Sequence, residues 1–177
     1  NKWGEVDEIL TSVGGKREPN VATGDCGWIA LGFSAAEVKD TRATLAEWAA
    51  GRDDVKKTLG EAAAQQYLSE VREEAWMCHL TLQLIARLWK LRIIVVTAHE
   101  DHPVVCIRPQ GIPDRELVKR TRVVALAEQH FERVILPRHG VSTLARQAKF
   151  ACLTRRNATS PRPQAMDETT CEESVEK

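Results

Sequence analysis

The chain has 177 residues, 43% hydrophobic and 28% charged, which is the composition of a globular domain with its own core. Its formal net charge is zero, so no basic excess indicates nucleic acid binding and no acidic excess indicates overall disorder. No apolar run approaches the roughly 18 residues of a membrane-spanning helix. Five cysteines at wide spacings, without a CxxC pair, predict reduced thiols in a cytoplasmic protein rather than disulfides or a zinc site. The start at Asn1, without a methionine, indicates a fragment of a longer chain.

The first half of the chain has helical periodicity. Apolar residues recur at intervals of three and four, and glycines follow several of the predicted helices. In chain order, the predicted elements are a helix over 6–13, a polar loop over 16–20, helices over 26–36 and 41–50, a longer helix over 53–71, and a helix over 76–90. Thr41 is the expected N-cap of the second short helix, and Gly51 its end.

From residue 92 the apolar pattern changes to short β-branched runs. The predicted strands cover 92–97, 104–107, 121–127 and 130–136, with a charged loop or short helix over 113–119 and an amphipathic helix over 142–153. Strands that follow a series of helices predict an α+β fold, with helices packed on a small mixed β-sheet. We therefore expect one domain over 1–153.

The segment 154–177 is polar, contains prolines and becomes acidic after residue 166. Such a composition cannot bury a core, so we predict a disordered tail. Basic residues precede its acidic end, and a block of this kind is either a solvated tail or a docking segment.

A turn at Gly24-Asp25 leads into Cys26, which is followed by an apolar run. This pattern predicts a loop that enters a buried helix with a cysteine at its start. Unpaired backbone N–H groups at a helix N-terminus favour the thiolate, which is the nucleophilic form of cysteine. The other interpretation is that Cys26 is a small buried hydrophobic residue beside Trp28.

His130 begins the last predicted strand, and Glu132 lies two residues later on the same face. A thiol nucleophile needs an imidazole to exchange its proton, and a third group commonly orients that ring. His130 with Glu132 fits these roles, although a strand-edge histidine bonded to solvent is equally consistent with the spacing. Cys78-His79 has no partners at metal-ligand spacing, so we assign His79 to packing or to the surface.

The order of these motifs resembles the ovarian-tumour (OTU) family of cysteine proteases, including the otubain-like deubiquitinases. The residues that carry the resemblance are the Thr23-Gly24-Asp25-Cys26 turn with Trp28, the segment from Trp76 into Val96, and His130-Phe131-Glu132. Thr23 stands where the family has an aspartate, and Glu132 is longer than the usual acid. These departures and the fragment-like start indicate a viral or pathogen member, with host cytoplasm as its location.

The resemblance implies a monomeric thiol protease that cleaves after the C-terminal glycine of ubiquitin or a ubiquitin-like modifier, with no cofactor or metal. It assigns Cys26 as nucleophile, His130 as acid and base, and Glu132 as the orienting group. Backbone N–H groups of Gly24, Asp25 and Cys26 would hold the oxyanion, and Gly27 and Trp28 would line the substrate channel. For Trp28, a large apolar residue, packing in the core is favoured over contact with substrate. Two alternatives remain: a protease that trims its own polyprotein, and a catalytically silent ubiquitin-binding module.

Overall fold

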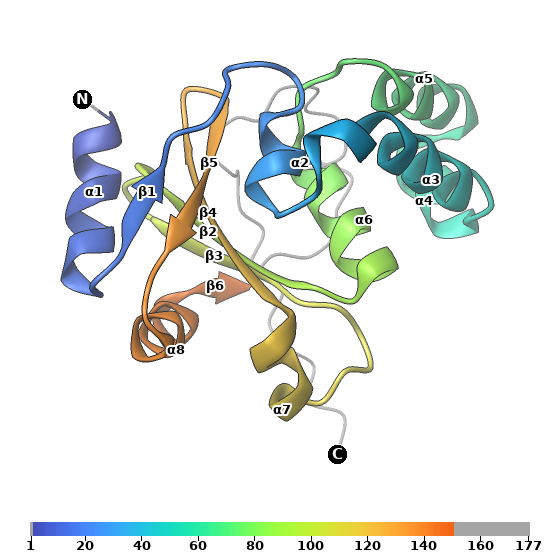
Figure 1. Cartoon of the computed structure of the whole chain (residues 1–177). Coiled ribbons are helices and arrows are strands. Elements are labelled where there is room, and N and C mark those ends of the chain that lie inside the picture. The colour runs from blue at the N-terminus through green and yellow to red at the C-terminus, as the bar shows by residue number, and fades with distance from the viewer. Residues whose placement is uncertain (1, 151–177) are drawn as a thin grey trace.

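A six-stranded mixed sheet with helices on both faces forms the centre of the molecule (Figure 1). The computed structural model describes residues 2–150 of the chain, and side-chain surroundings up to residue 148. The strand order is β1-β5-β4-β2-β3-β6, in which β2 pairs in parallel with β4 and antiparallel with β3. Hairpin β4–β5 is antiparallel, and β1 adds to the outer edge of β5.

The strands are β1 (Lys16–Glu18), β2 (Arg92–Thr97), β3 (Val104–Ile107), β4 (Thr121–Ala127), β5 (His130–Ile135) and β6 (Lys149–Phe150). Side chains of β2 alternate between two cores, with Ile93 and Val95 in one and Ile94 and Val96 in the other. Burial on both faces explains why the central strands are continuous β-branched runs. The four strands predicted from those runs are confirmed.

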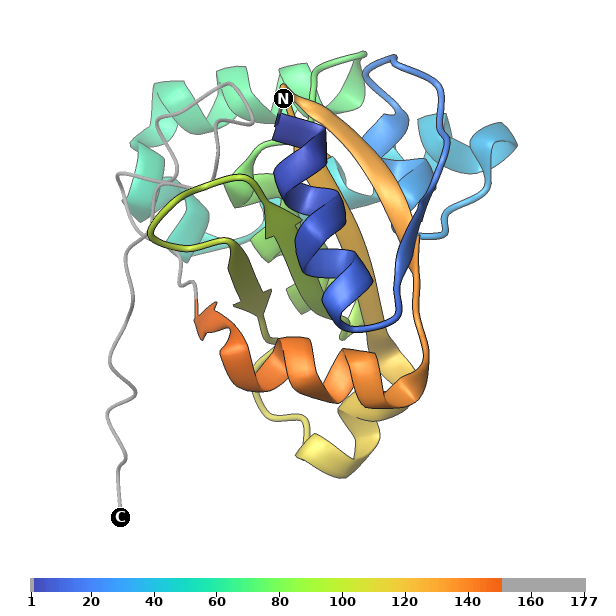
Figure 2. The same cartoon turned by 90° about the vertical axis from the view of Figure 1, so that its left-hand side faces the viewer.

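The helical elements are α1 (Lys2–Ser12), α2 (Cys26–Ala30), the 3₁₀ turn η1 (Ala35–Glu37), α3 (Val38–Ala50), α4 (Asp53–Leu59), α5 (Glu61–Arg72), α6 (His79–Trp89), α7 (Asp114–Leu117), the 3₁₀ turn η2 (Val118–Arg120) and α8 (Arg138–Gln147). Helices α1 and α8 cover one face of the sheet (Figure 2), while α2 and α6 lie against the other, with α3, α4 and α5 beyond them. No helix among residues 2–150 is long and apolar enough to cross a membrane.

Several predicted boundaries were wrong. The helix predicted over 53–71 is two helices, because Gly60 has φ +85°, a left-handed conformation that ends the first. The polar loop predicted over 16–20 contains β1, a short edge strand whose exposed faces leave no apolar alternation. Thr41 lies inside α3 and does not cap it, since its hydroxyl donates to the carbonyl of Glu37, one turn earlier.

Other helices differ at their ends. The helix predicted over 26–36 stops at Ala30, and Gly32 with φ +96° turns the chain into η1. Helix α6 begins at His79 instead of residue 76, and α8 begins at Arg138, directly after Pro137. Pro137 suits the position before a helix, because its missing N–H would have no partner there. The tail predicted over 154–177 and the residues 151–153 lie outside the described residues.

Candidate active site

The outer edge of β5 changes partner halfway along the strand. Strand β1 pairs with β5 from Ile135 up to Arg133, and Pro19, which has no N–H to continue the ladder, then turns the chain away. Beyond this point, the N–H and C=O groups of Phe131 form hydrogen bonds with Cys26 and Asn20 instead of with a strand. Its N–H donates to Sγ of Cys26 at 3.5 Å, and its carbonyl accepts from Nδ2 of Asn20 at 3.1 Å. The thiol therefore takes the place of a neighbouring strand.

Asn20 joins the two halves of this site. Its Nδ2 also donates to the carbonyl of Cys26 at 2.8 Å, so one side-chain amide holds both Cys26 and Phe131. The sequence predicts only a polar loop at Asn20 and no role for its side chain. The only local signal was a polar side chain directly after Pro19, which does not identify a partner more than a hundred residues away.

Cys26 is 1% exposed. Burial raises the pKa of its thiol above the usual value, although the N–H groups of Phe131 and Gly27 act in the opposite direction. Helix α2 spans only five residues, so little dipole is available to favour the thiolate. In this conformation burial outweighs these N–H groups, contrary to the prediction that the helix start lowers the pKa of Cys26.

His130 and Glu132 lie on the same face of β5, as their spacing predicted. The Nε2 atom of His130 is 3.4 Å from Oε2 of Glu132, and the imidazole meets the indole of Trp3 edge-on with centroids 6.1 Å apart. The other ring nitrogen, Nδ1, is buried and has no hydrogen-bond partner among the described residues. One nitrogen thus faces the acid, while the second is available for another group.

Glu132 is 7% exposed and is paired with a positively charged side chain. Arg17 of β1 forms an ion pair with Glu132 and a second with Asp7 of α1, at 2.7 Å. The guanidinium of Arg17 also stacks on Trp3 at 4.1 Å from the ring centroid. The hydrogen bonds to Asp7 and Glu132 raise the pKa of Arg17, so the arginine stays charged beside both carboxylates.

The structure brings Cys26 and His130 to the same end of β5. Because the amide nitrogen of Phe131 is bonded to the carbonyl carbon of His130, the Cα of His130 lies within about 6 Å of Sγ. The imidazole, however, lies on the α1 side of the sheet, whereas Cys26 belongs to the core on the α2 side. No hydrogen bond joins the ring to Sγ within the described residues.

The cysteine turn is tightly packed. The amide of Cys26 donates to the carbonyl of Thr23 at 3.0 Å, and the amide of Asp25 makes a longer contact of 3.4 Å with Oγ1 of Thr23. A Cβ atom at Gly24 would collide with the carbonyl oxygen of Glu74, so only glycine fits there. In this conformation the Cys26 amide is therefore occupied, contrary to the prediction that it is free to hold an oxyanion.

Gly27 and Trp28 do not line a channel. Trp28 is 0% exposed and packs edge-on against Phe33 and Trp89, and a Cβ at Gly27 would lie 2.8 Å from Sδ of Met77. The substrate-channel prediction was wrong for both residues, and Trp28 packs in the core, as its size had favoured, because other elements cover the short α2 helix.

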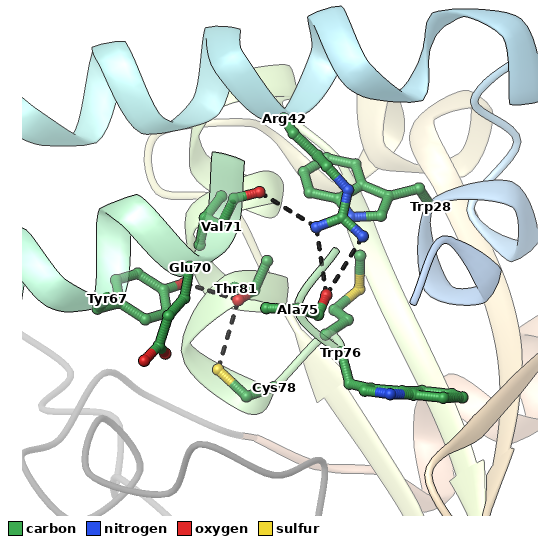
Figure 3. Close-up of a pocket in the computed structure, with 10 residues that line it drawn as sticks. Trp28, Arg42, Tyr67, Glu70, Val71, Ala75, Trp76, Cys78 and Thr81 are labelled. Atoms are coloured by element: carbon green, nitrogen blue, oxygen red, sulfur yellow. Dashed lines mark hydrogen bonds between the residues drawn. The ribbon is translucent and has the colours of Figure 1, made fainter. Parts of the chain in front are cut away.

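Arg42 of α3 binds the cysteine turn through its guanidinium group. It is 3% exposed and donates to Oδ1 of Asp25 at 2.9 Å and to the carbonyl of Gly24 at 2.8 Å. Further bonds, drawn in Figure 3, reach the carbonyl of Val71 near the end of α5 and the carbonyl of Ala75 in the segment between α5 and α6. Arg42 was missed in the sequence, although a charged residue on the apolar stripe with Val38, Leu45 and Ala49 was a usable signal.

A cavity of about 20 Å³ lies beside Arg42, with room for about one water molecule (Figure 3). A hydrogen-bond chain from the hydroxyl of Tyr67 through Thr81 to the thiol of Cys78 lines its far side. The cavity is too small for a substrate. Among residues 2–150, no group of three or more His, Cys, Asp or Glu side chains could hold a metal ion.

Comparison with known proteins bears on the fold. No protein-family model matches the sequence, and no curated protein matches it. Among solved structures, the chain is similar to the OTU domain of OTUD1, with a TM-score of 0.61 and 15% sequence identity over 76% of this chain and 94% of that one. At this identity the likeness shows the fold alone. The chain has an OTU-like α+β fold, as the sequence predicted.

Proposed function

We propose that the protein is a cysteine-type deubiquitinase that cleaves after the C-terminal glycine of ubiquitin or a ubiquitin-like modifier. The OTU-like fold supports this reading, and one observation carries it. The thiol of Cys26 accepts a hydrogen bond from the peptide group between His130 and Phe131, while Glu132 stands beside the imidazole. The backbone of the proposed base thus lies beside the proposed nucleophile, while the imidazole and the proposed orienting acid lie on the other side of the sheet.

In the proposed reaction, Nδ1 of His130 accepts the proton of the Cys26 thiol, and the thiolate attacks the carbonyl carbon of the scissile bond. His130 then donates this proton to the leaving amine. In the second half, it takes a proton from the water that hydrolyses the thioester. Because the ring must come within about 3–4 Å of Sγ for the first transfer, the imidazole has to move around the edge of β5.

The oxyanion would be held by backbone N–H groups of the turn at Gly24, Asp25 and Cys26. For the Cys26 amide to take part, it must leave the carbonyl of Thr23. Loss of one oxyanion donor typically costs about 3–4 kcal/mol in the transition state, so this exchange determines much of the rate. We expect the Cys26 amide to leave the carbonyl of Thr23 when the modifier's C-terminal segment binds.

A second candidate function is a catalytically silent module that binds ubiquitin. The buried thiol with its raised pKa and the occupied Cys26 amide favour it. Trimming of a larger precursor by the same thiol would be an additional activity of the enzyme. A monomeric state, a cytoplasmic location, and an otubain-like or viral origin stay predictions from the sequence.

The experiment is a reaction with ubiquitin that bears a C-terminal electrophile, repeated with ubiquitin-like modifiers. The enzyme proposal expects one adduct at Cys26, which is absent in Cys26→Ala, strongly reduced in His130→Ala and unchanged in the control Cys78→Ala. Cys78 is also a free, buried thiol, so this control tests general thiol reactivity. An adduct that persists in Cys26→Ala contradicts the proposal, and binding without any adduct identifies the silent module.

A further inference from the structure

A hollow of about 300 Å³ opens at the other end of the sheet, between α7 and α8. In Figure 1 these helices lie below the sheet, away from α2, and Figure 2 shows α8 crossing beneath β3. Strand β4 runs from this end to the hairpin that carries His130, so its six steps separate the two places by roughly 20 Å. The hollow is therefore distinct from the candidate active site.

Three arginines from three elements line this hollow: Arg92 at the start of β2, Arg108 after β3, and Arg146 in the last turn of α8. Within residues 2–150, Asp114 is the one carboxylate of the lining. This described part of the lining thus carries three positive charges against one negative charge, a net charge of two positive. Helix α8 adds no acidic residue within Arg138–Gln147.

Two of these arginines donate to uncharged hydroxyl groups. Nε of Arg92 donates to the hydroxyl of Thr121 at 2.9 Å, and Nη2 of Arg146 makes a 3.4 Å contact with the hydroxyl of Thr143. Arg108 forms an ion pair with Asp114, a residue whose side chain is 79% exposed. A guanidinium group has five N–H donors, so the hydrogen bonds of Arg92 and Arg146 leave donors for a ligand in the hollow.

The thiol of Cys106, which also lines the hollow, lies in the electrostatic field of two of these arginines. Burial raises the pKa of Cys106 to about 11, and Arg92 and Arg108 oppose that rise. Both guanidinium groups therefore act on the same point inside the hollow.

We propose that this hollow is a binding site for a phosphate group, as a free phosphate or a phosphate monoester. Guanidinium forks match the oxygens of phosphate and bind them in pairs, and phosphate carries about 1.5 to 2 negative charges at pH 7, which matches the net charge of the lining. The volume is at the lower end of small-ligand pockets, which start at roughly 300 Å³. The site is independent of the proposed protease activity.

The test is calorimetric titration of the full chain with inorganic phosphate at constant ionic strength. We expect Arg146→Gln and Arg92→Gln each to weaken binding by about tenfold or more, since each removes a charged donor. Asp114→Asn should tighten it severalfold, because it removes the competing carboxylate. Arg138→Gln is the matched control, an exposed arginine about 12 Å along the same helix and outside the hollow.

A phosphoserine peptide forms the second arm. Binding of inorganic phosphate alone assigns the hollow to free phosphate, and binding of both ligands shows that it accepts a phosphate carried on a chain. The proposal is overturned if neither ligand binds, or if Arg146→Gln and Arg138→Gln weaken binding equally. Arg146 is exposed on α8, so its substitution tests the site even if Arg92→Gln does not fold.

Discussion

The sulfur of Cys26 lies 3.5 Å from the amide nitrogen of Phe131, a residue 105 positions later in the chain. This contact joins the segment that precedes α2 to the strand that carries His130. A thiol is a weak acceptor, so the contact itself adds little stability. The position of the sulfur depends instead on the groups that hold the loop against the edge of β5, and these groups can be tested individually.

Asn20→Ala removes both side-chain hydrogen bonds that join Cys26 to Phe131. Two main-chain carbonyls lose a donor, so we expect the free energy of unfolding to fall by about 2 kcal/mol. Labelling of Cys26 by the ubiquitin electrophile should slow, while alkylation by a small reagent should become faster because the thiol is less protected. The control Gln66→Ala removes an exposed hydrogen bond to Glu70 and should change none of these values. Equal behaviour of the two variants would show that Asn20 does not position the thiol.

Glu132→Gln removes the charge beside His130 and keeps the shape of the side chain. We expect the rate of ubiquitin-adduct formation to fall by about tenfold to a thousandfold, as for other orienting acids. Arg17 keeps its second carboxylate partner, Asp7. The free energy of unfolding should therefore fall by less than the roughly 3–5 kcal/mol that is lost when a buried ion pair is broken.

Asp7→Asn is the matched control for this variant. It removes the other carboxylate of Arg17, and no contact of Asp7 with His130 is seen. We expect a small loss of stability with an unchanged adduct rate. If Asp7→Asn slows the reaction as much as Glu132→Gln, the effect comes from the ion-pair cluster as a whole, and Glu132 has no orienting role of its own.

Arg42→Lys should destabilise the cysteine turn. A lysine ammonium cannot reach Asp25, Gly24 and the carbonyl of Val71 in α5 at once, so buried acceptors lose their donors. We expect the free energy of unfolding to fall by about 3 kcal/mol. Amide hydrogen exchange should become faster in both segments that Arg42 joins.

The control for this prediction is Arg52→Lys. Arg52 pairs with Asp54 at 3.2 Å with both side chains more than a third exposed, so its contribution is within about 1 kcal/mol. If Arg42→Lys lowers the free energy of unfolding no more than Arg52→Lys does, then the packing of α3, and not the hydrogen bonds of Arg42, holds the turn.

The sequence predicted the central strands well because their pattern has a single physical cause. Residues 92–97 and 121–127 are buried on both faces, and burial on both faces requires a continuous apolar run. Strand β1 has no such pattern, because it is held by main-chain pairing to β5 while its side chains stay largely exposed. Its existence follows from the neighbouring strand and not from its own residues.

The site was predictable in part. Cys26, His130 and Glu132 follow from a turn, a strand start and an i, i+2 spacing, which are all local features. Asn20 and Arg42 act on main-chain carbonyls, which every residue has, so the sequence does not show which carbonyl is the partner. The burial of Cys26 likewise depends on packing against β5 and the segment before α6, which sequence periodicity does not describe.

His79→Gln should reduce the dependence of stability on acid pH. Burial lowers the pKa of His79 from the usual 6.5 to about 4 in the folded protein. As pH falls through 6.5, the unfolded chain takes up a proton that the folded chain excludes, so stability is lost between pH 6.5 and about 4. At 1.36 kcal/mol per pH unit this loss approaches about 3 kcal/mol.

Chemical denaturation at several pH values from 7 to 4 measures this loss, and subtraction of the variant's curve removes the contribution of the carboxylates. The control His139→Gln replaces an exposed histidine of α8 and should reproduce the unsubstituted curve. Gln83 remains beside position 79, so glutamine can occupy the site without an added charge. If His79→Gln shows the same acid slope as the unsubstituted chain, then His79 is protonated in the folded state and its surroundings do not exclude the charge.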